Sequence, residues 1–289
     1  MKALLTIKYP EEQVEKLKEL GYDVVVRKGE LSDEDYDCDV LHCFKTLRAD
    51  NVSKFKNLKF VQLASIGFEH LPKEELLKTD IVIANQKGIY SKPIGEWIVF
   101  NILEIIKNSK SLHEYQKSKV WDFVKDIDEL EDKTLLFLGT GTITMEAVKR
   151  LQNFGVKMIG LNSDGRRIDG FDECHKLSDI GLYSKDADFI INVLPSTDKT
   201  NNYINKDVIA KFRKGVNFIN VSRGAVVNEK DLYEALINGT IKNACLDVFE
   251  TEPLDEKSPF WTMENVYVSP HISWSSSKKA EREIGRAHV

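Results

Sequence analysis

Short apolar runs alternate with helical patterns along most of the chain, and this alternation constrains the fold more than any other feature. In residues 1–85 the runs KALLTIKY, YDVVVRK, VLHCF, KFVQLAS and IVIAN are separated by helical patterns, the clearest at 10–21 and 48–58. Alternation of strands and helices is typical of a parallel sheet covered by helices. The sequence therefore predicts an α/β fold.

A second alternating series occupies the rest of the chain, after a predicted long helix at 93–119 with a buried apolar stripe. Its strands are KTLLFLG, VKMIGLN, DFIINVLP, VNFINVSRG, NACLDVF and NVYVSP. Six strands with intervening helices predict a Rossmann-type, doubly wound parallel sheet, in which ligands bind at the carboxyl ends of the strands. Chemistry-bearing residues are therefore sought at those ends.

Composition narrows the class of protein. A chain of 289 residues is long for one core and suits two domains. The 41 basic and 46 acidic residues are scattered without a single-sign block, which argues against nucleic acid or a membrane surface as a partner. The N-terminal residues MKALLTIKYP lack the apolar region of a signal peptide, so we expect a cytoplasmic protein. We expect no metal site, because neither the histidines nor the cysteines have ligand spacing.

The stretch LFLGTGTITMEAVKRL matches a dinucleotide-binding turn between a strand and a helix. Gly139 permits the tight turn, and Gly141 lets a pyrophosphate approach the amides at the helix N-terminus. Thr144 replaces the third glycine of the usual pattern, and two glycines alone also fit a plain strand-to-helix turn. The candidate cofactor-binding residues here are Gly139, Thr140, Gly141, Thr142 and Ile143.

Three side chains with complementary chemistry follow three different strands of the second series. Arg223 follows VNFINVS, Glu252 follows NACLDVF, and His271 follows NVYVSP. Reduction of a ketone by hydride transfer needs a proton donor, a cation to orient the substrate and an acid to keep the donor protonated. The trio meets these needs, although a structural Arg223–Glu252 salt bridge with His271 capping a loop is the alternative.

The ordered motifs of this chain resemble the D-isomer-specific 2-hydroxyacid dehydrogenases. They include ASIGFEHL, NQKGIYSKPIGEW, LFLGTGTI, NVLPSTDKT, INVSRGAVVNEKDLYEAL, LDVFETEPL and SPHISW. The resemblance implies that His271 is the acid–base residue, that Glu252 is its partner, and that Arg223 clamps the substrate carboxylate and carbonyl. It also implies a small 2-keto or 2-hydroxy acid as substrate and a homodimer formed through the cofactor domain.

The same resemblance assigns further binding residues. It implies that Asp247 holds the nicotinamide carboxamide, although an acid that hydrogen-bonds its own loop is the alternative. The loop at Ser65, Ile66 and Gly67 would offer backbone amides to the substrate carboxylate. A turn beside the cofactor would include Leu194, Pro195 and Ser196, with an ordinary strand-ending turn as the alternative.

The resemblance also sets the expected domains. Residues 1–94 would form a flavodoxin-like substrate domain, and residues 95–275 the dinucleotide-binding domain. Relatives return to the first domain through C-terminal helices, for which this chain lacks room, so we expect a truncated C-terminus. The last residues, IGRAHV at 284–289, match the translation of a common sequencing-library adapter, and we interpret them as foreign to the natural protein, His288 included.

The choice of nicotinamide cofactor depends on GLNSDGRR, residues 160–167. An acid normally ends the second strand and excludes a 2′-phosphate, but this chain has Asn162 followed by Ser163. Arg166 and Arg167 suit a phosphate, whereas an inward-facing Asp164 would restore preference for NAD. We therefore expect NAD(P) and favour NADP, with a solvated loop as the alternative.

Taken with the resemblance, the residues predict an oxidoreductase that interconverts a small 2-keto acid and a D-2-hydroxy acid. A phosphoglycerate dehydrogenase-like enzyme is one alternative, and a non-catalytic nucleotide-sensing protein on the same fold is another. Formate dehydrogenase is disfavoured, because the residue before Pro253 is Glu252 where the resemblance would require glutamine. The intact trio argues for catalysis.

Overall fold

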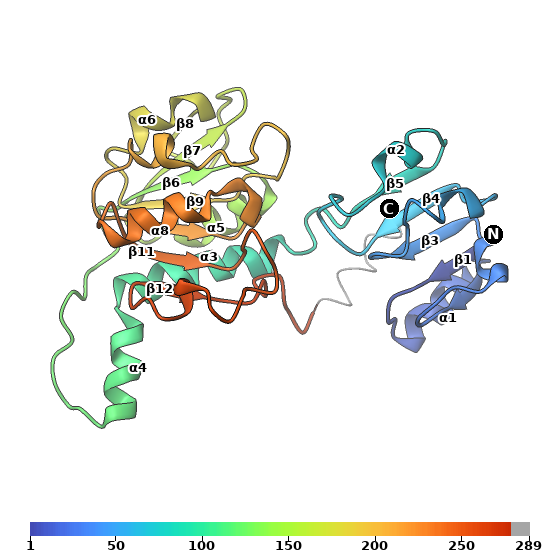
Figure 1. Cartoon of the computed structure of the whole chain (residues 1–289), viewed down its shortest axis with the longest axis horizontal. Coiled ribbons are helices and arrows are strands. Elements are labelled where there is room, and N and C mark those ends of the chain that lie inside the picture. The colour runs from blue at the N-terminus through green and yellow to red at the C-terminus, as the bar shows by residue number, and fades with distance from the viewer. Residues whose placement is uncertain (279–289) are drawn as a thin grey trace. The chain divides into compact units, whose positions relative to one another are not determined.

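The computed structural model describes residues 1–278 and divides them into two compact units, each with its own parallel sheet (Figure 1). Unit 1 contains Met1–Tyr90 and residues 276–278, and unit 2 contains Ser91–Ser275. The expected domain boundary at 94–95 falls inside the first helix of unit 2. The expected foreign tail at 284–289 lies outside the described residues.

Unit 1 is a five-stranded sheet in the order β2-β1-β3-β4-β5, with every pair parallel. This is the flavodoxin-like order, as expected. Apolar side chains of the middle strands, among them Leu4, Leu41 and Leu63, are fully buried and form its core. The strands are β1 (Lys2–Leu5), β2 (Asp23–Val26), β3 (Val40–Cys43), β4 (Phe60–Leu63) and β5 (Val82–Ala84); the helices are α1 (Glu11–Glu19) and α2 (Lys73–Leu76), with 3-10 turns η1 (Asp33–Tyr36) and η2 (Val52–Lys54).

The prediction of a helix over residues 48–58 is wrong, because only the short turn η2 forms there. The side chain of Asn51 accepts the Arg48 N–H at 2.9 Å and donates to the Thr46 carbonyl at 2.9 Å. These local bonds offer the backbone an alternative to a helix. The apolar residue Phe55 is still buried. The spacing of apolar residues therefore predicted correctly which side chain is buried, but not the length of the helix.

Unit 2 is a seven-stranded sheet in the order β12-β11-β10-β9-β6-β7-β8, again with every pair parallel. Counted from β6, this is the Rossmann order with one further strand at its end. The strands are β6 (Thr134–Leu138), β7 (Lys157–Asn162), β8 (Glu173–Lys176), β9 (Phe189–Asn192), β10 (Val216–Asn220), β11 (Ile241–Leu246) and β12 (Val266–Val268).

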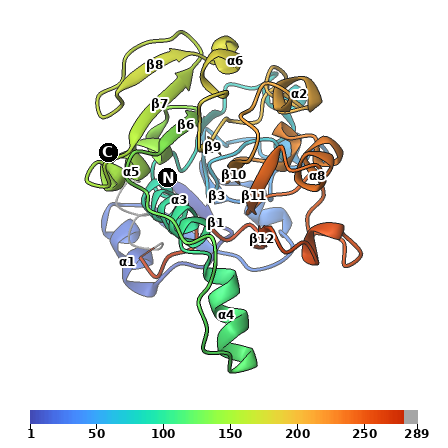
Figure 2. The same cartoon turned by 90° about the vertical axis from the view of Figure 1, so that its left-hand side faces the viewer.

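The sequence predicted six of these seven strands and missed β8. Its residues, ECHK, show no apolar run, because β8 is an edge strand that pairs only with β7 (Figure 2). The five inner strands, β6, β7, β9, β10 and β11, carry near-continuous apolar runs because they are largely buried on both faces. The helices of unit 2 are α3 (Ser91–Ile106), α4 (Ser109–Ser118), α5 (Thr142–Leu151), α6 (Ile180–Tyr183), α7 (Lys206–Ile209) and α8 (Glu229–Ile237), with 3-10 turns η3 (Leu177–Asp179), η4 (Gly224–Val226) and η5 (Pro259–Trp261).

The single long helix predicted over 93–119 is broken into α3 and α4. Asn108 lies between them in the left-handed conformation, with φ at 46°, and asparagine tolerates this region better than most residues. The apolar stripe ends at Ile106, and no residue of α4 is buried. Figures 1 and 2 both show α4 projecting away from the sheet of unit 2.

Helices α3 and α5 pack very closely at Gly95. A Cβ at this position would lie 2.7 Å from the Cβ of Glu146 and 3.0 Å from the backbone nitrogen of Ala147. At the start of the same helix, the Ser91 hydroxyl donates to the Thr142 hydroxyl at 2.8 Å. The first residue of unit 2 is therefore bonded to the first turn of α5.

Within residues 1–278, no helix is long and apolar enough to cross a membrane. The four cysteines are free thiols, of which Cys38, Cys43 and Cys245 are buried. Burial raises the pKa of Cys38 and of Cys43 to about 11, so both remain protonated near neutral pH. The described residues contain no group of three histidine, cysteine or acidic side chains arranged for a metal ion.

Candidate active site

The turn between β6 and α5 has the shape that a dinucleotide requires. Gly139 has φ at 99°, and a Cβ there would lie 2.9 Å from the carbonyl oxygen of Val193, so only glycine fits. Helix α5 begins at Thr142, as predicted. Thr144 is fully buried and donates from its hydroxyl to the Gly139 carbonyl at 2.8 Å, which explains how threonine replaces the third glycine.

The start of α5 fits a pyrophosphate. Gly141 occupies the N-cap without a side-chain hydrogen bond, so the first amides of the helix are not capped. Nothing lies within 4 Å of the position that a Cβ of Gly141 would take. Thr140 and Ile143 are half-buried beside it, whereas Thr142 is exposed. The turn thus combines open space with unsatisfied donors and the positive end of a helix dipole.

Glu252 and His271 are in direct contact at the carboxyl ends of β11 and β12. The Nδ1 atom of His271 lies 2.7 Å from Oε2 of Glu252, and both side chains are about one-third exposed, at 35% and 36%. The other carboxylate oxygen of Glu252 accepts the Phe249 N–H at 3.0 Å. This leaves Nε2 of His271 as the ring nitrogen available to a substrate.

The carboxyl group of Glu252 is held in its ionised form. Burial would raise its pKa, but the hydrogen bonds from His271 and Phe249, together with the charges of His271 and Arg223, lower it below the ordinary value. An ionised carboxylate only accepts hydrogen bonds, so Nδ1 of His271 must carry a proton. The charge of Arg223 is one of the causes that lower this pKa, so Arg223 lies near Glu252 at the same end of the sheet.

Buried amides that the sequence analysis missed support the backbone beside Arg223. The Asn192 side chain donates to Oδ1 of Asn220 at 3.0 Å and to the Ser222 hydroxyl at 3.2 Å. The guanidinium of Arg223 donates to the Ser222 carbonyl at 2.8 Å. The runs DFIIN and VNFIN contained the signal, because an asparagine at the end of an otherwise apolar strand must find a partner once buried.

The carboxylate of Asp247 is buried and holds the loop that carries His271. Its oxygens accept the Ser269 hydroxyl at 2.6 Å, the Ile272 N–H at 2.9 Å and the Ser273 N–H at 3.1 Å. Its backbone carbonyl accepts the His271 N–H at 2.8 Å. His271 itself has φ at 50°, a strained conformation that these bonds maintain. Asp247 therefore bonds the loop that follows β12 instead of its own loop after β11, and its carboxylate retains room for one further donor.

Asn162 is buried and organises the loop after β7. Its Oδ1 accepts the Gly165 N–H at 2.7 Å, and its Nδ2 donates to the Arg166 carbonyl at 2.9 Å. Asp164 does not turn inward, because its carboxylate pairs with the Arg166 guanidinium at 2.9 Å in solvent. The Arg166 hydrogen bond holds the pKa of Asp164 below its usual range. Ser163 and Arg167 are exposed on the same loop.

The turn after β9 is fixed by Thr200. Its hydroxyl donates to the Pro195 carbonyl at 2.6 Å and accepts the Thr197 N–H at 2.9 Å. Leu194 is buried, whereas Pro195 is exposed and Ser196 half-buried. The turn therefore presents Pro195 and Ser196 at the carboxyl end of β9, the strand that pairs with β6 before the dinucleotide turn.

In unit 1, the carbonyl groups of the loop after β4 all accept hydrogen bonds. The Ser65 carbonyl accepts the Gln86 N–H at 2.9 Å, the Ile66 carbonyl accepts the Asn85 side chain at 2.7 Å, and the Gly67 carbonyl accepts the Ser65 hydroxyl at 2.7 Å. In the part of the chain that the structure describes, the N–H groups of these three residues have no acceptor. Successive free amides of this kind suit an anion.

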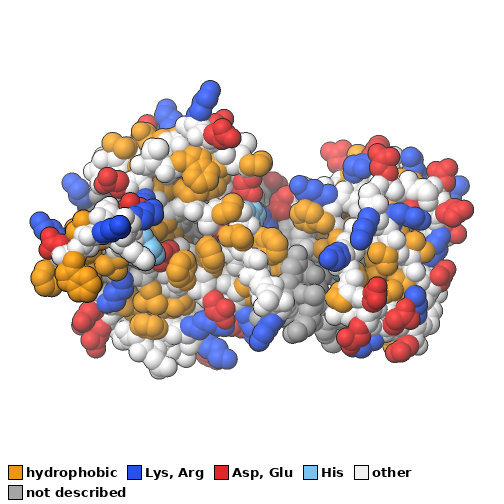
Figure 3. Space-filling model, turned by 90° about the horizontal axis from the view of Figure 1, so that it is seen from below, with side chains coloured by type: hydrophobic (Ala, Val, Ile, Leu, Met, Phe, Trp, Pro, Cys, Tyr) orange, Lys and Arg blue, Asp and Glu red, His pale blue; other side chains and the backbone are white. Residues whose placement is uncertain are grey.

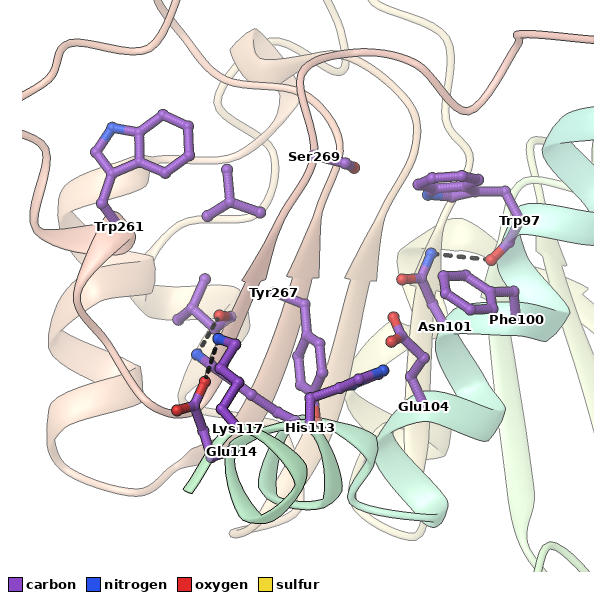
Figure 4. Close-up of a pocket in the computed structure, with 13 residues that line it drawn as sticks. Trp97, Phe100, Asn101, Glu104, His113, Glu114, Lys117, Trp261, Tyr267 and Ser269 are labelled. Carbon is purple, nitrogen blue, oxygen red and sulfur yellow. Dashed lines mark hydrogen bonds and ion pairs between the residues drawn. The ribbon is translucent and has the colours of Figure 1, made fainter. Parts of the chain in front are cut away.

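A hollow of about 480 Å³ lies on unit 2 between α3, α4, η5 and β12, and Ser269 at the end of β12 belongs to its lining. Figure 4 shows Trp97 and Phe100 on one side of it, Trp261 on the other, and Tyr267 between them. Trp261 and Phe100 are about half exposed, at 49% and 48%. Figure 3 views the molecule from the side toward which α4 projects, and hydrophobic side chains gather on this face of unit 2.

The segment that follows α4 also exposes aromatic side chains. We use the word arm for residues 109–130, which comprise α4 and an irregular stretch up to Leu130. Trp121 is 103% exposed and Phe123 is 93% exposed. Two fully solvated aromatic side chains on one short segment are unusual, because each forfeits a large burial free energy.

A Rossmann sheet with a dinucleotide turn, and with a histidine–carboxylate pair at its strand ends, defines a nicotinamide-dependent oxidoreductase. A family model described as D-isomer specific 2-hydroxyacid dehydrogenase, NAD binding domain, matches residues 99–273. The chain belongs to the D-isomer-specific 2-hydroxyacid dehydrogenase family.

Relatives with known names are similar over most of the chain. A glyoxylate reductase of Thermofilum pendens is 30% identical over 297 residues, covering 97% of this chain and 87% of its own. A D-3-phosphoglycerate dehydrogenase of Methanocaldococcus jannaschii is 31% identical over 293 residues, covering 99% of this chain and 55% of its own. This chain therefore spans about half the length of that dehydrogenase.

A solved structure is similar as well. It is the NADPH-dependent glyoxylate/hydroxypyruvate reductase of Sinorhizobium meliloti in complex with NADP and sulfate, with a TM-score of 0.83 and 27% sequence identity. The match covers 99% of this chain and 93% of that chain. The fold class expected from the sequence is thus confirmed.

Proposed function

We propose that this chain reduces a small 2-keto acid to the D-2-hydroxy acid with a nicotinamide cofactor, and that Arg223, Glu252 and His271 are its catalytic residues. The observation that carries the proposal is the 2.7 Å contact between His271 and Glu252, on the sheet that carries the dinucleotide turn. A bound nicotinamide would supply or accept the hydride, with its pyrophosphate at Gly139–Ile143. Pro195 and Ser196 would line the same cofactor.

The chain's own residues would manage charge and the proton. His271, protonated at Nδ1 toward Glu252, would donate a proton from Nε2 to the carbonyl oxygen of the substrate. Glu252 stabilises the positive charge that the imidazole carries before this transfer. Arg223 would orient and polarise the substrate by charge-assisted hydrogen bonds. In the oxidation direction, His271 would accept the proton from the hydroxyl group.

Two further groups have proposed binding roles. The amides of Ser65, Ile66 and Gly67 would bind the substrate carboxylate, because they have no acceptor within the described residues while the carbonyl groups beside them already accept hydrogen bonds. The remaining lone pair of Asp247 would accept a hydrogen bond from the nicotinamide carboxamide. Neither role needs a metal ion.

A panel of 2-keto acids, including glyoxylate, hydroxypyruvate and pyruvate, tests the activity through oxidation of NADPH and NADH. His271→Ala should abolish most turnover and leave the affinity for NADPH within about twofold, since the imidazole acts on the substrate. His113→Ala, on the arm, serves as the matched control and should retain full activity. Turnover that survives His271→Ala would refute the assignment.

Similarity to the phosphoglycerate dehydrogenase of M. jannaschii favours a second candidate, reduction of 3-phosphohydroxypyruvate. Including this compound in the panel separates the two candidates. Its phosphate group would need an additional basic side chain for binding, whereas glyoxylate has no phosphate group. Tight NADPH binding without turnover of any keto acid would instead favour a nucleotide-sensing protein. We also propose the cytoplasmic location expected from the sequence, and cell fractionation tests it.

We propose NADP(H) as the preferred cofactor. Asn162 places no charge at the end of β7, and Asp164 is paired with Arg166 instead of facing inward. Similarity to a reductase solved with NADP supports the same choice. The ratio of kcat/KM for NADPH and NADH tests it, and a large preference for NADH would overturn it.

We also propose that two copies of the chain pair through unit 2. The arm exposes Trp121 and Phe123, while the hollow between α3 and β12 exposes aromatic side chains on the same unit. A two-fold interface would bury both features in both copies, because each chain contributes the same surface. The proposed occupant of the hollow is therefore the second copy.

Light scattering during size-exclusion chromatography tests the pairing. A dimer should have twice the 33.0 kDa mass of one chain. Trp121→Ser combined with Phe123→Ser should shift the mass to that of the monomer, whereas Leu182→Ser, at a residue 62% exposed outside the arm, should not. A monomeric wild-type protein, or a dimer that survives the arm double variant, would refute this interface.

A further inference from the structure

The loop after β7 folds over the end of the neighbouring edge strand. Asn162, the last residue of β7, pairs in register with Lys176, the last residue of β8. The side chain of Asn162 fixes Gly165 and Arg166 by the hydrogen bonds given above. Figure 2 shows β8 beside β7 at the outer edge of the sheet. The position of this loop relative to β8 is thus set by buried contacts.

Lys176 lies directly against this loop. Gly165 has φ at 77°, and a Cβ there would lie 3.1 Å from Cγ of Lys176 and 3.3 Å from its backbone nitrogen. The aliphatic stem of the lysine therefore passes across the glycine. Gly165 immediately precedes Arg166 and Arg167, so the three basic residues belong to one surface region around this glycine.

The cations around this loop are only partly neutralised. Glu173 on β8 is paired with Lys157 at 2.6 Å and with His175 at 3.0 Å. Asp164 is paired with Arg166. Among residues 1–278, neither Lys176 nor Arg167 makes an ion pair. Three cations thus share one carboxylate, and the surplus of positive charge suits a phosphate dianion.

We propose that Lys176 is a specificity-determining residue that binds the 2′-phosphate of NADP(H) together with Arg166 and Arg167, and that Asp164 weakens this binding by occupying Arg166. The inference rests on the proposed use of a nicotinamide dinucleotide and adds a residue from outside the loop GLNSDGRR. It also assigns opposite effects to two exposed charges of this surface. A 2′-phosphate must displace Asp164 from Arg166, whereas it meets no competitor at Lys176.

Isothermal titration calorimetry with adenosine 2′,5′-bisphosphate and with 5′-AMP tests the proposal without requiring turnover. The two ligands differ only in the 2′-phosphate. Lys176→Gln should weaken binding of the bisphosphate about three- to tenfold, in the range of one exposed charge-assisted contact, and leave binding of 5′-AMP within about twofold. Asp164→Asn should strengthen binding of the bisphosphate by a similar factor.

Lys185→Gln is the matched control. Lys185 is also exposed, but it precedes β9 and lies toward the amino end of the strands. This variant should bind both ligands as the wild type does. An equal loss of bisphosphate affinity in Lys185→Gln would mean that Lys176 acts only through the overall charge of the protein, and it would overturn the proposal.

The remaining outcomes separate this inference from the proposed function. Wild-type preference for the bisphosphate with no change in Lys176→Gln would overturn the role of Lys176 and leave the NADP preference intact. Equal affinity of the wild type for both ligands would overturn both. Failure of the wild type to bind either ligand would contradict the nicotinamide cofactor itself.

Discussion

Replacement of Gly224 by alanine is the sharpest test of how the trio is supported. Gly224 follows Arg223, and a Cβ there would lie 1.9 Å from the carbonyl carbon of Phe249, 2.0 Å from its oxygen and 2.3 Å from the nitrogen of Glu250. Carbon atoms pack favourably at about 3.5 Å, so one backbone segment must move by about 1.5 Å. The Phe249 N–H donates to Glu252, and the movement should therefore reach the carboxylate of Glu252, for which a catalytic role is proposed above.

The magnitude of the effect follows from this displacement. Overpacking against backbone should lower the free energy of unfolding by about 3 kcal/mol or more, because no flexible side chain can give way. The thermal midpoint of unfolding should fall by about 6–12 °C. A shift of about 1 Å at a catalytic group should also lower kcat about 100-fold. Urea unfolding followed by tryptophan fluorescence measures the first quantity, and the keto-acid assay measures the last.

Gly141→Ala is the control for this experiment. Gly141 has φ at −79°, and no atom lies within 4 Å of the position that a Cβ would take, so alanine should leave stability unchanged to within about 0.5 kcal/mol. The same methyl group should weaken NADPH binding, because it occupies the space through which the pyrophosphate approaches. A Gly224→Ala protein with wild-type stability and activity would refute the packing argument.

Three further outcomes are expected. Burial holds the pKa of His42 at about 4, so the unfolded chain binds more protons between about pH 6.5 and pH 4 and stability falls by up to about 3 kcal/mol as the pH drops. Urea titrations of His42→Leu should lose this dependence. Burial would raise the pKa of Asp35, but the hydrogen bonds from Arg27 and Ser32 lower it. Its contribution is present above its unfolded pKa and lost as the pH falls through the lower folded value, so Asp35→Asn should cost about 1–3 kcal/mol at pH 7 and little at pH 2. Glu252→Gln should lower kcat for keto-acid reduction, because a neutral amide cannot stabilise a positively charged imidazole as the carboxylate does. An unchanged kcat in the keto-acid assay would contradict the pairing with the imidazole.

The sequence predicted those parts of the fold that depend on burial. Apolar runs located the strands that are covered on both faces, whereas β8 was missed because an edge strand such as ECHK needs no apolar run. Helix ends were less predictable, since they depend on single residues. The break between α3 and α4, for example, depends on the left-handed conformation of Asn108, which the apolar pattern does not reveal.

The site was predictable to the extent that topology determines it. Strand ends of a parallel sheet share one edge, so Glu252 and His271 could be brought together from sequence order alone. The donors to Asp247 could not, because they depend on the path of the loop from Ser269 to Ser273. The contact between Lys176 and Gly165 depends on the missed strand and was therefore out of reach as well.

The close crossing at Gly95 has a mechanical consequence. The chain enters unit 2 at Ser91, whose hydroxyl is bonded to Thr142, and α3 and α5 approach too closely at Gly95 for either to slide past the other. A displacement of the chain at Ser91 would therefore be passed to the turn between β6 and α5 through this hydrogen bond and this close packing.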